Sequence, residues 1–230
     1  MAAGNFLPLS ILACNMELVT LVSVNVARPQ VLGTRGGGLV VSGIRKQSVT
    51  ETTLLLDRLN LAGDDQADRR VHGGPDKAVY AYASEHFAAW AAELGRPVGP
   101  AFFGENLTTA GVLEAAVGIG DLWAWGDAVL QVVQPRWPCF KLTMHSRTPD
   151  MAARFRGSGR TGWYFRVLEP GAVPVAGPMT VVERHAAGVS VLDAHHAALP
   201  GADAELVARV LAVPALAAEW RGMLRPRATR

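Results

Sequence analysis

Short runs of hydrophobic residues, each bounded by Gly, Pro, Asn or Asp, dominate the sequence up to about residue 184. They are rich in Val and Leu and mostly too short for helices, a pattern that favours buried strands. Two of these runs flank the turn pair Gly126-Asp127 directly, as in a β-hairpin. Strands are therefore expected at residues 18–27, 39–44, 52–60, 121–125, 128–134, 163–168 and 179–184.

The hydrophobic spacing becomes helical after residue 184. Three segments follow, at residues 189–199, 203–211 and 215–224, and Pro200-Gly201 and Pro214 separate them. Earlier helices are expected only at residues 84–95, where Ser84 can cap, and at residues 150–156. The pattern predicts a mainly β fold, in which a β-barrel-like domain with a few helices precedes a small C-terminal three-helix module.

Three regions are expected along the chain. Residues 1–15 form an N-terminal extension without predicted order, residues 16–184 the barrel domain, and residues 185–230 the helical module. The apolar run at residues 6–14 has no positive flank and is too short to cross a bilayer, so neither secretion nor membrane attachment is expected. A cytoplasmic location follows.

Composition narrows the classes of function. Half of the residues are hydrophobic and 18% are charged, which excludes intrinsic disorder. A net charge of +2 argues against a nucleic-acid polymer as partner. Two cysteines exclude a disulfide framework and a four-thiolate zinc site. Of the 22 basic residues, only Lys46, Lys77 and Lys141 are lysines, so the position of each is informative.

The segment QPRWPCFK at residues 134–141 offers a reactive thiol. Its prolines restrict the backbone, and Cys139 leaves this rigid segment between Arg136 and Lys141. Nearby cations favour the thiolate, which is the ligand that a soft metal needs. The alternative is a buried structural cysteine among aromatic residues. Nothing in the local sequence supports a protease-like pair with His145.

Two loops present polar groups of other kinds. His72 precedes Gly-Gly-Pro, where a backbone can approach a ligand while His72 and Lys77 donate to it. A tight turn with a solvated lysine explains the same pattern. Asn106, in a loop that contains glycine, can read the donor and acceptor edges of a heterocycle. The alternative there is an Asx-turn or a cap.

Two further patterns are not expected to bind ligands. The acidic segment GDDQAD at residues 63–68 lacks the glycine and glutamate of a calcium loop. Its carboxylates are therefore expected to be solvated or paired with Arg69 and Arg70. Residues 157–162 match G-x-G-x-x-G, but the predicted order there is helix, loop, strand, which excludes a dinucleotide fingerprint.

With these motifs in view, the chain resembles the MOSC family, in particular its YiiM-type members. The resemblance extends in order from about residue 16 to the C-terminus, and the helical tail resembles the three-α module of that family. The motifs that carry it are SGIRK (42–46), GDDQAD (63–68), VHGGPDKAVYAY (71–82), FGENLTT (103–109), QPRWPCFKL (134–142) and SGRTGWYFRVLEPGAV (158–173).

The resemblance implies a molybdenum cofactor, a pyranopterin dithiolene (molybdopterin) with a phosphate. Cys139 matches the cysteine that ligates molybdenum in the family. Trp137 stands where a smaller residue is expected, and the difference is expected to reshape the pocket mouth. The residues implied to contact the pterin or its phosphate are Lys46, His72, Asn106 and Arg136, with Lys141 as a further candidate.

The implied activity is the reduction of small N-hydroxylated substrates, such as 6-hydroxyaminopurine-type bases. The chain shows no flavin, iron–sulfur or nicotinamide signature, so a separate electron-donating reductase is an expected partner. Two alternatives stay open: a sulfur carrier that uses a Cys139 persulfide, and a protein that binds and delivers the cofactor. The oligomeric state, including a homodimer, is also open.

Overall fold

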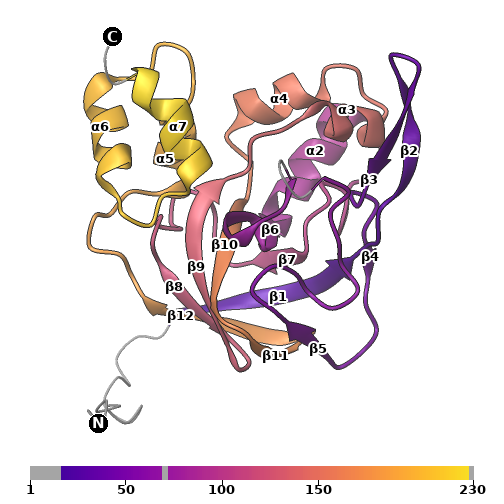
Figure 1. Cartoon of the computed structure of the whole chain (residues 1–230), viewed down its shortest axis with the longest axis horizontal. Helices are drawn as coiled ribbons and strands as arrows, with labels where there is room; N and C mark the ends of the chain where they lie inside the picture. Colours follow the sequence, from indigo (N-terminus) through magenta and orange to yellow (C-terminus); the bar gives the residue numbers. More distant parts are fainter. Residues whose placement is uncertain (1–16, 69–71, 228–230) are drawn as a thin grey trace.

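A closed β-barrel forms the centre of the molecule in the computed structural model, which describes residues 17–68 and 72–227 (Figure 1). Seven strands pair in the ring order β12, β8, β9, β10, β6, β7 and β1, and β1 pairs again with β12. In this ring β6 and β7 run parallel, and the other pairs are antiparallel. The strands are β1 (Glu17–Val26), β6 (Val79–Ala83), β7 (Leu107–Ala110), β8 (Leu122–Trp125), β9 (Ala128–Pro135), β10 (Trp163–Glu169) and β12 (Gly177–Glu183).

Large side chains fill the barrel interior. Trp123 and Trp163 are fully buried with ring centroids 6.0 Å apart, and Phe165 meets Trp123 edge to face at 5.3 Å. Leu130 and Val132, two residues apart on β9, point to the same side of the strand and are also fully buried. The barrel is therefore a packed core, and ligands must bind outside it.

Helices and short strands surround the barrel. A second buried cluster, built on aromatic residues such as Trp90, Phe103 and Phe155, lies under the helices beside the barrel. Two small sheets, β2 with β3 and β5 with β11, complete the domain, and β4 extends the edge at β1. The elements are β2 (Gln30–Arg35), β3 (Gly38–Ser42), β4 (Gln47–Ser48), β5 (Thr53–Leu56), β11 (Gly171–Pro174), η1 (Pro75–Lys77), η2 (Ser84–His86), α2 (Phe87–Leu94), α3 (Phe140–Ser146) and α4 (Met151–Ser158).

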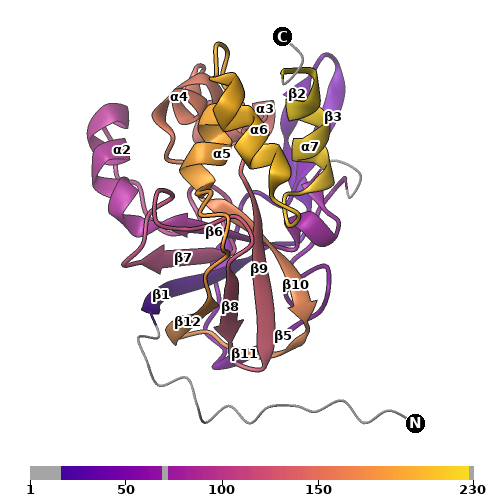
Figure 2. The same cartoon turned by 90° about the vertical axis from the view of Figure 1, so that its left-hand side faces the viewer.

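The C-terminal module consists of α5 (Val191–Ala197), α6 (Ala204–Ala212) and α7 (Ala218–Leu224), followed by η3 (Arg225–Arg227). Ser190 and Asp193 form a capping box at the start of α5, and Asp203 caps α6. The module packs at the same end of the barrel as α2, α3 and α4 (Figure 2). The predicted fold class, a mainly β barrel with a three-helix module, is thus confirmed.

Several local expectations need correction. The predicted strand at residues 52–60 ends at Leu56, and Ser84 begins η2 without capping a helix. Strands β2, β4, β6, β7 and β11 and helix α3 were not predicted at all. The glycine motif at residues 157–162 begins in the last turn of α4 and ends directly before β10, in the expected order of helix, loop and strand. The predicted extension at residues 1–15 lies outside the described residues.

Within the described ranges, every helix is too short or too polar to cross a bilayer.

Candidate functional site

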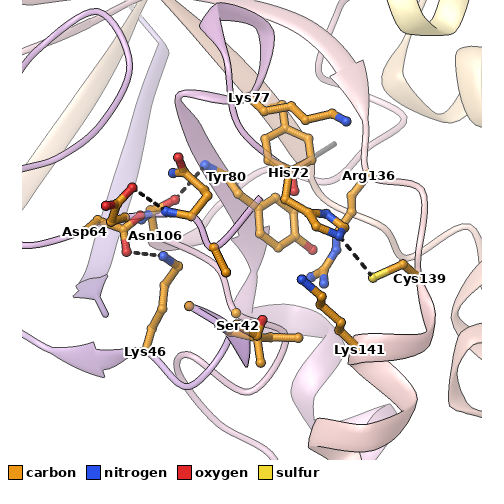
Figure 3. A pocket seen from close by; sticks show the side chains of 17 residues that line it. Ser42, Lys46, Asp64, His72, Lys77, Tyr80, Asn106, Arg136, Cys139 and Lys141 are labelled. Carbon is orange, nitrogen blue, oxygen red and sulfur yellow. Dashed lines mark hydrogen bonds and ion pairs between the residues drawn. The ribbon is translucent and has the colours of Figure 1, made fainter. Parts of the chain in front are cut away.

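One cavity collects the candidate residues from distant parts of the sequence (Figure 3). It opens to solvent, and the space of about 580 Å³ between its walls includes the open mouth. All six residues predicted for the site line it, and so do all three lysines of the chain. The lining residues are Ser42, Gly43, Ile44, Lys46, Asp64, Asp65, Gln66, Ala67, His72, Lys77, Tyr80, Gly104, Asn106, Arg136, Cys139, Lys141 and Tyr164.

Cys139 lies at the junction between β9 and α3. The strand ends at Pro135, and the extended backbone of Cys139 begins the helix, so the side chain leaves a short, fixed connection. The thiol is free and only half-buried, and its Sγ lies 3.9 Å from Nε2 of His72. Figure 3 shows both groups facing the cavity. Cys139 is therefore accessible from the cavity and is not sealed in the core.

Arg136 is held rigidly in the cavity wall. Its guanidinium donates to the carbonyl oxygen of Phe103 and lies over the ring of Tyr80, 4.7 Å from the ring centroid. The Tyr80 hydroxyl in turn donates to the carbonyl oxygen of Thr161 at 2.8 Å. Burial raises the pKa of Tyr80, so this phenol stays neutral and does not cancel the charge of Arg136.

A buried network forms the opposite side of the cavity in the view of Figure 3. The Lys46 ammonium pairs with Asp64, and the side chains are 7% and 1% exposed. Asp64 also accepts from the backbone N–H of Ala27 at 2.9 Å and from Nδ2 of Asn106 at 2.9 Å. Burial lowers the pKa of Lys46, and the carboxylate of Asp64 opposes that effect.

The expectation for Asp64 was therefore wrong. It is not solvated, since only 8% of it is exposed; Arg69 and Arg70 lie outside the described residues. A buried Asp requires a paired cation, and Lys46 supplies it. The motifs SGIRK and GDDQAD thus meet in one ion pair, although 18 positions separate the two residues.

Asn106 uses its polar atoms within the protein. Its Oδ1 accepts from the backbone N–H of Tyr80 at 3.1 Å, and its Nδ2 donates to Asp64 and to the carbonyl oxygen of Asn25. These contacts occupy both amide donors. In this structure Asn106 therefore links the strands that form the wall of the cavity. Hydrogen bonding of its amide to a heterocyclic ligand stays a prediction.

Cations dominate the electrostatics around the thiol. Burial lowers the pKa of His72 to about 4, and the charges of Lys141, Lys77 and Arg136 add to this shift. The imidazole is therefore neutral near pH 7. Lys141 extends into the cavity below His72 in the view of Figure 3. The arrangement favours an anionic ligand next to the sulfur atom.

Sequence analysis missed two aromatic residues of the cavity, Tyr80 and Tyr164. Every residue of β6 is buried, and β10 alternates between buried and partly exposed residues. Only knowledge of the barrel pairing, in which Tyr164 lies opposite Tyr80, could have placed both rings at the cavity. Trp137 is the reverse case. It does not line the cavity, and its ring packs against His195 and Trp220, so the expected change at the pocket mouth is not found.

Comparison with known proteins agrees with this arrangement. A model of the MOSC domain matches residues 68–180, and a model of the YiiM-like, 3-alpha helix domain matches residues 189–227. The uncharacterized protein YflK of Bacillus subtilis is 40% identical over 206 residues, which cover 89% of this chain and 92% of the relative. A protein named Reductase from Gibberella moniliformis is 35% identical over 163 residues, 68% of this chain but 28% of its own length.

The crystal structure of YiiM from Geobacillus stearothermophilus has the same fold, with a TM-score of 0.76 and 33% sequence identity. The match covers 91% of this chain and 99% of that chain, so it includes both the barrel and the helical module. The chain therefore belongs to the MOSC family and, within it, to the YiiM-like proteins.

Proposed function

We propose that this protein is a molybdenum-cofactor-dependent reductase of small N-hydroxylated compounds, with the Cys139 thiolate as the metal ligand. The observation that carries the proposal is the position of Cys139, half-buried beside a cavity whose walls hold three lysines and Arg136. Membership of the MOSC family and the relative named Reductase support an oxidoreductase.

The residues present fit such a cofactor. Within residues 17–68 and 72–227, no group of three His, Cys, Asp or Glu side chains could hold a metal ion. A metal at Cys139 would therefore need its other ligands from an organic group, as a dithiolene provides. Lysines and Arg136 suit a phosphate.

The side chains of the site have distinct tasks in this proposal. Cys139 binds the metal, and Lys141 and Arg136 bind the anionic parts of the cofactor. Asp64 binds Lys46 and Asn106 on the opposite wall, and these contacts fix the positions of both side chains. When bound, the cofactor supplies the two-electron chemistry by which N–OH, two electrons and two protons give N–H and water. A separate reductase supplies the electrons.

Elemental analysis of protein from a host that makes molybdopterin tests the proposal. We expect about one molybdenum per chain, and loss of metal and of N-hydroxylated-base reduction in Cys139→Ser, because a hydroxyl is a harder and poorly ionised ligand. Cys14→Ser, which removes the other cysteine of the sequence, is the matched control and should keep both. Unchanged melting temperatures would show that folding is not the cause.

Two results would favour the alternatives. A labile sulfur on Cys139 without molybdenum would indicate a sulfur carrier with a persulfide. Stoichiometric molybdenum without turnover, when an artificial electron donor is present, would indicate a protein that binds and delivers the cofactor. If Cys139→Ser lost only stability and kept its activity per folded molecule, the thiol would be a packing group and the proposal would be wrong.

A further inference from the structure

The helical module contacts the cavity through an ion pair. Lys77 lines the cavity from η1, and its ammonium pairs with the carboxylate of Glu219 on α7. Figure 3 shows Lys77 at the rim, above His72. The Lys77 side chain is 12% exposed, whereas that of Glu219 is 61% exposed. Glu219 thus reaches, from the solvent side, a cation that belongs to the site.

The neighbouring residues fix this geometry. Asp76 accepts from Nε and Nη2 of Arg166 on β10 at 2.8 and 2.6 Å through one carboxylate oxygen. Its other oxygen accepts from the backbone N–H of Ala218, the first residue of α7, at 3.3 Å. Two consecutive residues of η1 therefore contact two consecutive residues of α7, so the start of this helix is aligned with the cavity rim.

The Lys77–Glu219 pair is suited to exchange. An ion pair with an exposed carboxylate is weak and screened by salt. Lys77 carries its charge on a flexible four-carbon chain with three donors, which can turn toward a new partner. An anion in the cavity would also meet Arg136 and Lys141, so it would compete for Lys77 with more than one attraction.

We propose that Glu219 is a positioning residue of the site. Its carboxylate holds Lys77 at the rim, and a multiply charged anion such as a phosphate group displaces it and binds Lys77 instead. The helical module thereby lowers the affinity of the cavity for anions and disfavours those too weakly charged to displace the carboxylate. That the natural ligand is the phosphate of a pterin cofactor rests on the proposed function. The competition between Glu219 and an anion rests on the geometry alone.

Binding of inorganic phosphate tests this inference directly. The full chain, purified from a host that cannot make the pterin cofactor, is titrated with phosphate at low ionic strength. We expect Glu219→Gln to tighten binding about two- to fivefold, the range of an exposed ion pair. Lys77→Met should weaken binding and abolish the effect of Glu219→Gln in the double variant. Glu219→Asp, which keeps the charge, should stay closer to the original protein.

Glu205→Gln is the matched control, because it removes one negative charge from the same module on α6, away from the residues that line the cavity. It should leave phosphate affinity unchanged. The inference would be overturned if Glu219→Gln changed phosphate affinity equally in the Lys77→Met background. It would also be overturned if Glu205→Gln had the same effect as Glu219→Gln, or if no variant bound phosphate. If phosphate binding shows the coupling between Lys77 and Glu219, but protein from a host that makes molybdopterin contains no molybdenum, this inference holds and the proposed function fails.

Discussion

The indole ring of Trp137 packs edge to face against the indole ring of Trp220, with 5.9 Å between the ring centroids. Trp137 lies two residues before Cys139, and Trp220 lies on α7 of the helical module. His195 of α5 packs on the same ring at 5.9 Å, and the guanidinium of Arg156 lies over it. The connection that carries the thiol is therefore anchored in the module.

Trp137→Ala should loosen this anchor. We expect a loss of about 2–4 kcal/mol in the free energy of unfolding, because a large ring leaves a site that cannot fully collapse. Hydrogen exchange at residues 136–142 should accelerate more than exchange in the barrel strands. Trp137→Phe, which keeps a smaller ring, should show less of both effects. Equal exchange across the whole chain would mean that Trp137 contributes only global stability.

The buried pair of Lys46 and Asp64 should respond asymmetrically to substitution. Asp64→Ala leaves a buried ammonium without its carboxylate, so we expect a loss of about 3–5 kcal/mol in unfolding free energy. Lys46→Met should cost less, because Asp64 keeps its hydrogen bonds from Ala27 and Asn106. The double variant Lys46→Met/Asp64→Asn should be more stable than Asp64→Ala.

Denaturant unfolding of these variants measures the asymmetry. Asp150→Asn, which breaks an exposed pair with Arg154 on α4, is the control and should leave stability nearly unchanged. Equal losses for Lys46→Met and Asp64→Ala, and a loss in the Lys46→Met/Asp64→Ala double variant equal to their sum, would show that the two side chains do not act as a unit.

Hydrophobic spacing and turn residues were sufficient to predict the barrel and the three-helix module, because strand runs and helical runs differ in period along this chain. The spacing of hydrophobic residues did not predict strand β6 or helix α3. The strand VYAYA is buried on both sides and is only five residues long, so it shows no alternation. Helix α3 begins directly after Pro138-Cys139, where the sequence reads as a rigid turn, and its burial is set by α4 and β2.

Chemical type singled out Cys139, His72 and Asn106 as candidates, the resemblance added Lys46 and Arg136, and neither indicated the partners of these residues. Cys139, His72 and Lys141 stand out as reactive or charged groups in restricted loops. The pairing of Lys46 with Asp64 and of Lys77 with Glu219 depends on contacts across 18 and 142 positions, which no local pattern reports. Long-range charge pairing therefore marks the limit of sequence reasoning in this protein.

Gly43 lines the cavity at a point of close approach between two backbones. A Cβ at this position would overlap the carbonyl oxygen of Asp65 and would lie 3.5 Å from that of Ala27. Gly43→Ala should therefore displace the segment that carries Asp64, with a loss of about 1–3 kcal/mol in unfolding free energy and weaker phosphate binding. Gly99→Ala, which meets nothing within 4 Å, is the control.

Glu105 should make stability depend on pH. It is fully buried, and burial raises its pKa to about 7 from 4.5, against hydrogen bonds from the Thr108 hydroxyl and the backbone N–H groups of Ala101 and Phe103. Between pH 4.5 and about 7 the folded chain holds a proton that the unfolded chain has lost. The free energy of unfolding should therefore fall by up to about 3 kcal/mol as pH rises through this window, and then level off.

Glu105→Gln removes this titration and keeps an oxygen that can accept from the Ala101 N–H and the Thr108 hydroxyl. Its amide nitrogen replaces the oxygen that accepts from the Phe103 N–H, which lowers stability by an amount that does not depend on pH. The difference in unfolding free energy between variant and original protein should therefore change across pH 4.5 to 7 in favour of the variant, and stay constant above about pH 8. Subtracting the two profiles cancels every other titrating group. A difference that is flat over the whole range would show that Glu105 is ionised in the folded protein throughout, held by its three donors.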